Sequence, residues 1–254
     1  MASSGPSART LEELREAMER NVLLTLTLHE VKLGLKSNLL RFWFALIMFF
    51  GLLFLLSQQG TQSMMSILIF FGFLGSIIHV VIASSTITGE VGGIADSLLS
   101  KAVRRWEYLL SKYLSQIILA LMVYFLIVGI AGVVIYQMDW YDEDLSWFNV
   151  GVLIGMFALI LVFFSSVGVM FSSIASKTVF SFLMGLLVWF VMVFLFLIFQ
   201  NWDVMYSPIR IIDHADLIIE GSWDVDWWKL VAFYVMAPVA FFGVSLVFFY
   251  NRDL

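Results

Sequence analysis

Six stretches of continuous apolar residues divide the chain. A helix of about 20 such residues spans the roughly 30 Å hydrocarbon layer of a bilayer. Strands of a membrane β-barrel alternate apolar and polar positions over about ten residues, and these stretches do not alternate. The pattern therefore predicts six transmembrane helices, at about 39–56, 64–84, 114–136, 150–171, 179–199 and 230–250.

The composition excludes other protein classes. Of the 254 residues, 61% are hydrophobic and 13% are charged, whereas a soluble domain is about half apolar and a quarter charged. Disorder requires low hydrophobicity, and a disulfide framework requires cysteine, which is absent. We therefore expect an all-α, polytopic membrane protein, with a cytoplasmic tail and amphipathic helix in residues 1–38 and a six-helix transmembrane domain in residues 39–254.

The basic residues indicate the orientation in the membrane. If the N-terminus is cytoplasmic, nine Lys and Arg near the span ends lie on the cytoplasmic side and two lie outside. The nine are Lys32, Lys36, Arg41, Lys101, Arg104, Arg105, Lys112, Lys177 and Arg252, and the two are Arg210 and Lys229. Short cytoplasmic loops carry the excess of Lys and Arg. We therefore expect both termini in the cytoplasm.

Two polar segments on the cytoplasmic side have helical patterns. Before the first span, leucines recur at spacings of three and four while Lys32 and Lys36 occupy another face, which predicts an amphipathic helix in the membrane interface, its basic side toward the lipid headgroups. The segment 85–113 begins with the turn-prone sequence Thr88-Gly89-Glu90-Val91-Gly92-Gly93 and continues as a helix with apolar and basic positions. Either the membrane surface or a protein partner would bury its apolar positions.

The external segment between spans five and six is predicted to form a short helix at about 209–219. It contains four tryptophans, which suit an interfacial belt, although a role in contacting substrate is the alternative. The acidic residues at 139–144 are interpreted as a solvated loop rather than a metal site. His79 is interpreted as a buried core residue.

Several kinds of chemistry are missing from the sequence. No Asp, Glu, Lys or Arg occupies the middle of a span, whereas coupled carriers and cation channels use such groups. The phosphate-binding pattern G-x-x-x-x-G-K-[ST] does not occur, and no catalytic or metal-ligand constellation stands out. The net charge of −5 argues against a nucleic-acid partner. We therefore expect neither an enzyme nor a bound cofactor or metal.

One cytoplasmic motif carries a family resemblance. In order, the segment contains Glu90, Gly92-Gly93, Leu98-Leu99-Ser100, Ala102-Val103, Arg105 and Leu109-Leu110-Ser111-Lys112. This order resembles the signature of ABC-2-type transporter permeases, the membrane subunits of many prokaryotic ABC systems. Two positions depart from it, since the family tends to have Pro at Ala102 and Gly at Ser111. The stretch from Glu30 through Lys32 and Lys36 is similar to the amphipathic connecting helix of such permeases.

The resemblance implies a subunit of a larger transporter, located in the cell membrane. Two permease copies, identical or different, would form the path, and two separate ATPase subunits would bind ATP and Mg²⁺ and dock from the cytoplasm. The segment 85–113 would be the coupling helix, with Leu98, Leu99 and Val103 in a groove of the ATPase and Arg104, Arg105 and Glu90 at its rim. The coupling residues it implies are Glu90, Gly92, Gly93, Leu98, Leu99, Ser100, Val103, Arg104, Arg105 and Lys112.

Two other functions remain open at this point. A membrane scaffold that anchors a cytoplasmic partner would use the same cytoplasmic segment without a path between protomers. A secondary carrier or channel is disfavoured by the missing intramembrane charges. Export rather than import follows from the resemblance alone, and the transported substrate does not follow from the sequence.

Overall fold

A computed structural model describes residues 22–57, 61–89, 103–138, 146–195, 207–223 and 226–251. Within these ranges the chain is helical and contains no strand, which confirms the all-α prediction. Five helices are long and apolar enough to cross a membrane. They are α3 (Asn38–Ser57), the α4–η1–α5 unit from Gln62 to Ser84, α7 (Arg105–Gln137), α8 (Trp147–Ile174) and α13 (Trp227–Tyr250).

The structure describes the segment predicted as a span at 179–199 as far as residue 195. It forms α9 (Thr178–Phe190), which continues into a π-helical turn, η2 (Val191–Leu195). The apolar helix Thr178–Phe194 falls below the length of the other five. At 1.5 Å per residue it rises about 26 Å, somewhat less than the hydrocarbon layer. The structure therefore contains five candidate spans in the described ranges and a sixth apolar helix that is too short to count with them.

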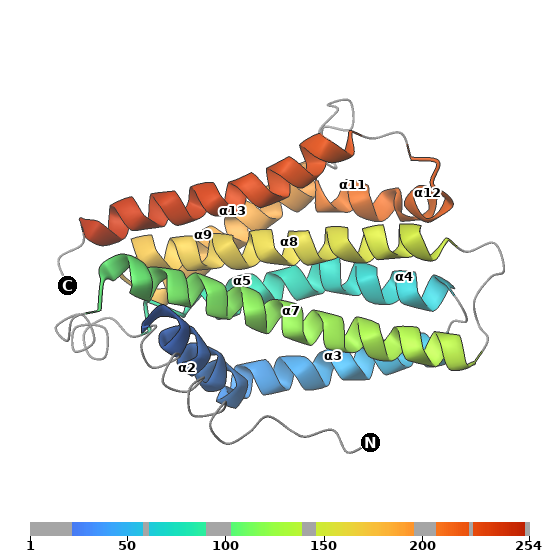
Figure 1. Ribbon diagram of the computed structural model, residues 1–254, viewed down its shortest axis with the longest axis horizontal. Helices are drawn as coiled ribbons and strands as arrows, with labels where there is room; N and C mark the ends of the chain where they lie inside the picture. Colours follow the sequence, from blue (N-terminus) through green and yellow to red (C-terminus); the bar gives the residue numbers. More distant parts are fainter. Residues whose placement is uncertain are drawn as a thin grey trace, which may run out of the picture.

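The long helices lie side by side along one axis, and α8 runs through the middle of them (Figure 1). It packs against α5, α7, α9 and α13. In its most apolar window 67% of the residues are buried, compared with 22% in α13. A helix that is apolar around its whole circumference is suited to such a central position.

Small residues let α5 (Ser76–Ser84) approach α8 closely. A Cβ added to Gly168 would lie 2.6 Å from the Cβ of Ala83 and 2.9 Å from the carbonyl oxygen of Val80. Any larger side chain at Gly168 would therefore push the two backbones apart. Close backbone contact at small residues is how helices gain packing energy in lipid, where the hydrophobic effect does not drive their association.

Helix α7 extends well beyond the span predicted at 114–136. It begins at Arg105, where the Glu107 carboxylate accepts the backbone N–H of Arg104 at 3.1 Å. Its 33 residues rise about 50 Å, which exceeds the hydrocarbon thickness by several turns. The end of the predicted cytoplasmic segment and the third span are thus one continuous helix.

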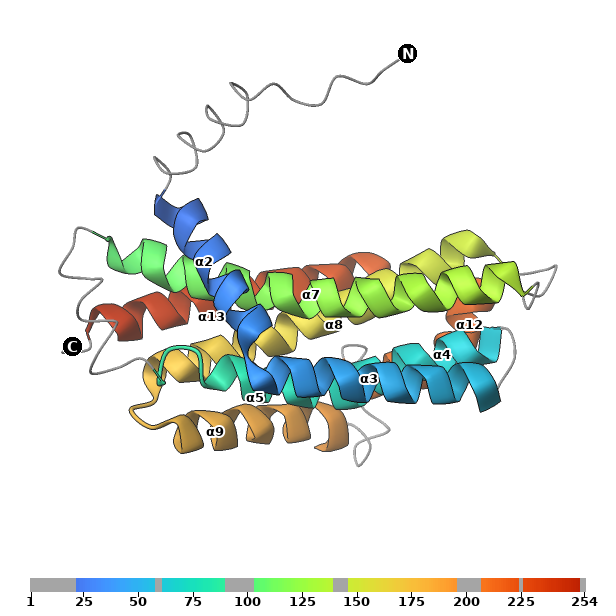
Figure 2. The ribbon, with the colours of Figure 1, turned by 90° about the horizontal axis from the view of Figure 1, so that it is seen from below.

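Shorter helices lie at the two ends of the bundle. α2 (Val22–Lys36) leaves the bundle axis and crosses α7, as Figure 2 shows. At the opposite end, α11 (Pro208–Asp213) and α12 (Ala215–Glu220) form the predicted external helix as two pieces. Gly221 ends α12 with φ of 72°, a left-handed conformation that favours glycine.

Candidate functional site

One end of the bundle brings together the start of α7, the ends of α5, α8 and α13, the start of α9, and helix α2 with the start of α3 that follows it (Figures 1 and 2). We call it the basic end, because most of the Lys and Arg of the described chain belong to these helix ends. Its members are Lys32, Lys36, Arg41, Arg104, Arg105, Lys112 and Lys177. It is also the end where the predicted coupling segment begins and finishes.

Helix α2 is joined to α7 by a buried ion pair. The Lys112 ammonium lies 2.8 Å from the Glu30 carboxylate, with the Lys112 side chain fully buried and that of Glu30 13% exposed. The ammonium also lies 5.3 Å from the centre of the Tyr108 ring, within range of a cation–π interaction. The structure thus brings one predicted residue of the connecting helix against one predicted residue of the coupling segment.

The packing of α2 differs from that of a helix that only lies in the membrane interface. Its buried residues are Thr27 and Val31, on the same face as Glu30, while Gly34 accommodates the side chain of Leu119 on α7. The leucines of the predicted apolar face are exposed, and so are Lys32 and Lys36. A second and partly polar face of α2 therefore packs on protein, while these leucines are exposed. Of the apolar positions in the predicted pattern, Val31 belongs to this packed face.

Arg105 is attached to the last transmembrane helix. Its guanidinium donates to the carbonyl oxygens of Tyr250 at 3.0 Å and Phe249 at 3.4 Å, which are among the carbonyls that the end of α13 leaves without an intrahelical partner. The Tyr108 ring stacks on Phe249 with 5.7 Å between centres. Arg105 therefore holds α13 within its own chain, whereas the resemblance implied that it lies at the rim of a partner's groove.

The two residues that precede α7 behave differently from each other. Val103 is partly buried against a small apolar cluster at the basic end. Arg104 is exposed. The cluster consists of Ala83, Ile87, Tyr108, Leu109, Tyr113, Val169 and Phe249. Val103 thus contacts its own bundle, whereas Arg104 is exposed.

Hydroxyl groups fix the start of the predicted coupling segment. The Ser172 hydroxyl accepts the backbone N–H groups of Ile87 at 2.9 Å and Thr88 at 3.1 Å. The Thr88 and Thr178 hydroxyls are hydrogen-bonded at 2.9 Å. These bonds tie residues 87–88 to the end of α8 and the start of α9. Ser172 was not among the predicted site residues, and its only signal in the sequence is a hydroxyl next to a short turn between two apolar segments.

Six of the predicted coupling residues lie outside the described part of the chain. They are Glu90, Gly92, Gly93, Leu98, Leu99 and Ser100. The described flanks of the segment are nevertheless fixed, with Thr88 held by α8 and α9 and Arg105 held by α13. The segment 90–102 is therefore bounded on both sides by attachments to different helices of the bundle.

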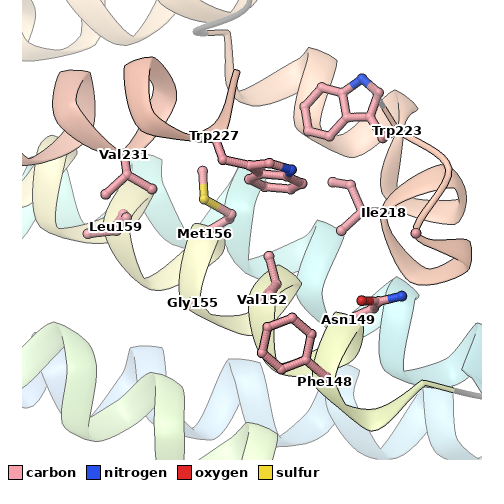
Figure 3. A pocket seen from close by; sticks show the side chains of 11 residues that line it. Phe148, Asn149, Val152, Gly155, Met156, Leu159, Ile218, Trp223, Trp227 and Val231 are labelled. Atoms are coloured by element: carbon pink, nitrogen blue, oxygen red, sulfur yellow. The ribbon is translucent and has the colours of Figure 1, made fainter. Parts of the chain in front are cut away.

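The opposite end of the bundle contains an apolar pocket of about 680 Å³ between α8, α12 and α13. Figure 3 shows Phe148, Val152 and Met156 on one side and Ile218 and Trp227 on the other. The polar groups at this end are largely used by the fold. The Asn149 amide, for example, donates to the carbonyl oxygen of Ile219 at 2.8 Å. The pocket suits an apolar group and offers little for polar recognition.

The start of α13, beside this pocket, has a charged cap. The Asp226 carboxylate lies 2.9 Å from the Lys229 ammonium, and the hydrogen bond from this side chain is the main cause that lowers the pKa of Asp226 below its ordinary value. Trp223 and Trp227 meet edge to face, with 5.4 Å between ring centres. Charged and indole groups together are typical of a membrane–water boundary.

The described residues include one buried imidazole in the bundle. His79 is buried and meets the Trp43 ring edge-on, with 5.6 Å between centres, as expected for a core residue. Within the described ranges, no group of three or more His, Asp or Glu side chains could hold a metal ion. No protein-family model matches the chain, and no curated protein matches it.

Proposed function

We propose that this chain is the membrane permease of an ABC transporter of the ABC-2 type, and that it exports its substrate. Two copies, or one copy with a second permease, form the translocation path in the cell membrane. Two separate ATPase subunits dock at the basic end and bind ATP and Mg²⁺. The chain itself carries no phosphate-binding loop, so the energy for transport comes from these partners.

This proposal rests on one observation: the residues that flank the segment 90–102 on each side are bonded to other helices of the bundle. At its start, Thr88 is bonded through Ser172 and Thr178 to α8 and α9. At its end, Arg105 begins α7 and is bonded to the last carbonyls of α13. A partner that displaces this segment would therefore move four helices of the bundle. Packed helices respond to such a displacement by shifting as units.

The Glu30–Lys112 pair extends this connection to α2. Because Lys112 lies in the second turn of α7 and is fully buried, α2 and the start of α7 are held as one body. A buried charge pair resists separation, since each partner alone would leave an uncompensated charge. The connecting helix and the coupling segment would then move together when the ATPase closes.

The topology belongs to the same proposal. The six spans include the α9–η2 helix, and both termini lie in the cytoplasm. The basic end then faces the cytoplasm, in agreement with the excess of Lys and Arg in cytoplasmic loops, and the apolar pocket near Trp227 faces outward. The pocket suits hydrophobic or amphipathic cargo in the exit region.

Purification of the tagged full chain from native membranes tests this function. We expect a copurifying subunit that contains the pattern G-x-x-x-x-G-K-[ST], and ATP hydrolysis by the complex. A partner without this pattern would favour the scaffold hypothesis. Purified protein that never associates with a nucleotide hydrolase would overturn the proposal.

A further inference from the structure

A second, smaller cavity lies at the elbow between α2 and α3, where both helices face α7. Its volume is about 290 Å³, and its lining includes Leu35, Phe44, Met122 and Leu126. The elbow itself is fixed by the Ser37 hydroxyl, which accepts the backbone N–H of Leu40 at 3.1 Å. Because α3 is one of the candidate membrane spans and begins here, the cavity lies near the boundary between headgroups and hydrocarbon.

The lining of this apolar cavity includes one cation. Arg41 belongs to the cavity lining and is exposed, and its long stem lets the guanidinium reach the headgroup level. Two further cations, Lys32 and Lys36, are exposed on α2. The site therefore combines an apolar lining with the guanidinium of Arg41.

The acidic residues nearby are already engaged. Helices α2, α3 and α7 contain two carboxylates, Glu30 and Glu107. Glu30 pairs with Lys112 at 2.8 Å, and Glu107 accepts the N–H of Arg104 at the start of α7. Among the described residues of the three helices that build the cavity, no carboxylate is therefore left to pair with Arg41. An anionic ligand would supply the missing charge.

We infer that the elbow binds an anionic phospholipid, with one acyl chain in the cavity and the phosphate on Arg41. Basic pockets between transmembrane helices are known to hold anionic headgroups, and the bilayer supplies this ligand at the height of the cavity. The lipid contacts α2, α3 and α7 together, and so it supports the same α2–α7 contact that the Glu30–Lys112 pair holds. The inference depends on the membrane-spanning helices and not on transport.

Native mass spectrometry of the purified full chain tests this site, with phosphatidylglycerol and phosphatidylcholine of identical acyl chains as probes. Arg41→Gln removes the headgroup contact, and Leu126→Trp fills the cavity without changing the charge. Lys177→Gln is the matched control, because Lys177 is an exposed cation at the same end of the bundle and is not part of the cavity lining. Glycerol phosphate added as a competitor separates a lipid site from a simple phosphate site.

We expect the wild-type chain and Lys177→Gln to retain phosphatidylglycerol in preference to phosphatidylcholine. Arg41→Gln should lower the affinity for phosphatidylglycerol about fivefold. It should lower that for phosphatidylcholine less, because the choline ammonium offsets the charge of its phosphate. Leu126→Trp should reduce binding of both lipids, and glycerol phosphate should not compete. Unchanged helicity and elution volume establish that each variant is folded. An unaltered preference in Arg41→Gln, an equal loss in Lys177→Gln, or displacement by glycerol phosphate would overturn the inference.

Discussion

The Lys112 ammonium and the Glu30 carboxylate lie 2.8 Å apart, in a position where the lysine side chain has no contact with solvent. This pair connects the helix that precedes the first span to the helix that leads into the third. Burying these two charges costs free energy. Their mutual attraction offsets that cost only while both are present. Separating α2 from α7 would therefore leave an uncompensated buried charge, which opposes the separation.

Replacing one partner of this pair should destabilise the protein. Glu30→Gln leaves the buried Lys112 charge without its counterion, and we expect a loss of about 3 kcal/mol in the free energy of unfolding. Unfolding in mixed detergent micelles, followed by circular dichroism, measures this value.

The control for this prediction removes both charges. Glu30→Leu combined with Lys112→Met should recover most of the stability, because apolar residues of similar volume often replace a buried pair without loss. Wild-type stability in Glu30→Gln would contradict the importance of the pair.

The neighbouring arginines at the start of α7 should differ in their roles. Arg105→Glu places a carboxylate against the carbonyl oxygens of Phe249 and Tyr250, and we expect it to lower the thermal stability of the isolated chain. Arg104 is exposed, so Arg104→Glu should leave that stability unchanged and instead weaken binding to the ATPase. Thermal unfolding and copurification of the partner measure the two effects separately.

The opposite result for Arg105→Glu would contradict this assignment of roles. If Arg105→Glu retained full stability and lost only the partner, Arg105 would belong to the partner's interface and not to the α13 contact.

Ser172 should be required for the anchor of residues 87–88. Ser172→Ala leaves the N–H groups of Ile87 and Thr88 without their acceptor, and we expect a loss of about 2 kcal/mol. Hydrogen exchange at these two amides should accelerate in the variant. Ser173→Ala is the matched control, since the Ser173 hydroxyl donates within its own helix to Met170, and it should change these amides little.

The contact between α5 and α8 should tolerate no side chain at Gly168. Gly168→Leu forces the helix apart from Val80 and Ala83, and we expect a loss of at least about 2 kcal/mol. Gly129→Leu is the control, because a Cβ at Gly129 meets no atom within 4 Å. Equal stability of the two variants, measured by unfolding in micelles, would show that the close approach is not needed.

The apolar pattern was sufficient for the helical class, because a backbone in lipid must satisfy its own hydrogen bonds. The predicted range 39–56 corresponds to α3 (Asn38–Ser57), and 230–250 corresponds to α13 (Trp227–Tyr250). The pattern did not show that the fifth segment changes from α-helix to π-helix at Val191, since that irregularity involves no polar residue.

The pattern was less informative about the basic end. Glu30 was identified only through a resemblance, and its pairing with Lys112 joins residues more than 80 positions apart, a distance over which periodicity carries no information. Arg105 was expected at a partner's groove, but its position is set by where α13 ends. Both contacts depend on tertiary packing, which the order of apolar and polar residues does not specify.

The most direct measurement for the proposed coupling is a cross-link from the cytoplasmic segment. The chain has no cysteine, so Ser100→Cys introduces a single reactive site, and Gln137→Cys at the far end of α7 provides the control. After attachment of a photoreactive maleimide in native membranes, we expect Ser100→Cys to cross-link to the ATP-hydrolysing subunit and Gln137→Cys to give no such product. Labelling of Ser100→Cys by a membrane-impermeant reagent in intact cells, or no cross-link to a nucleotide hydrolase, would contradict the account.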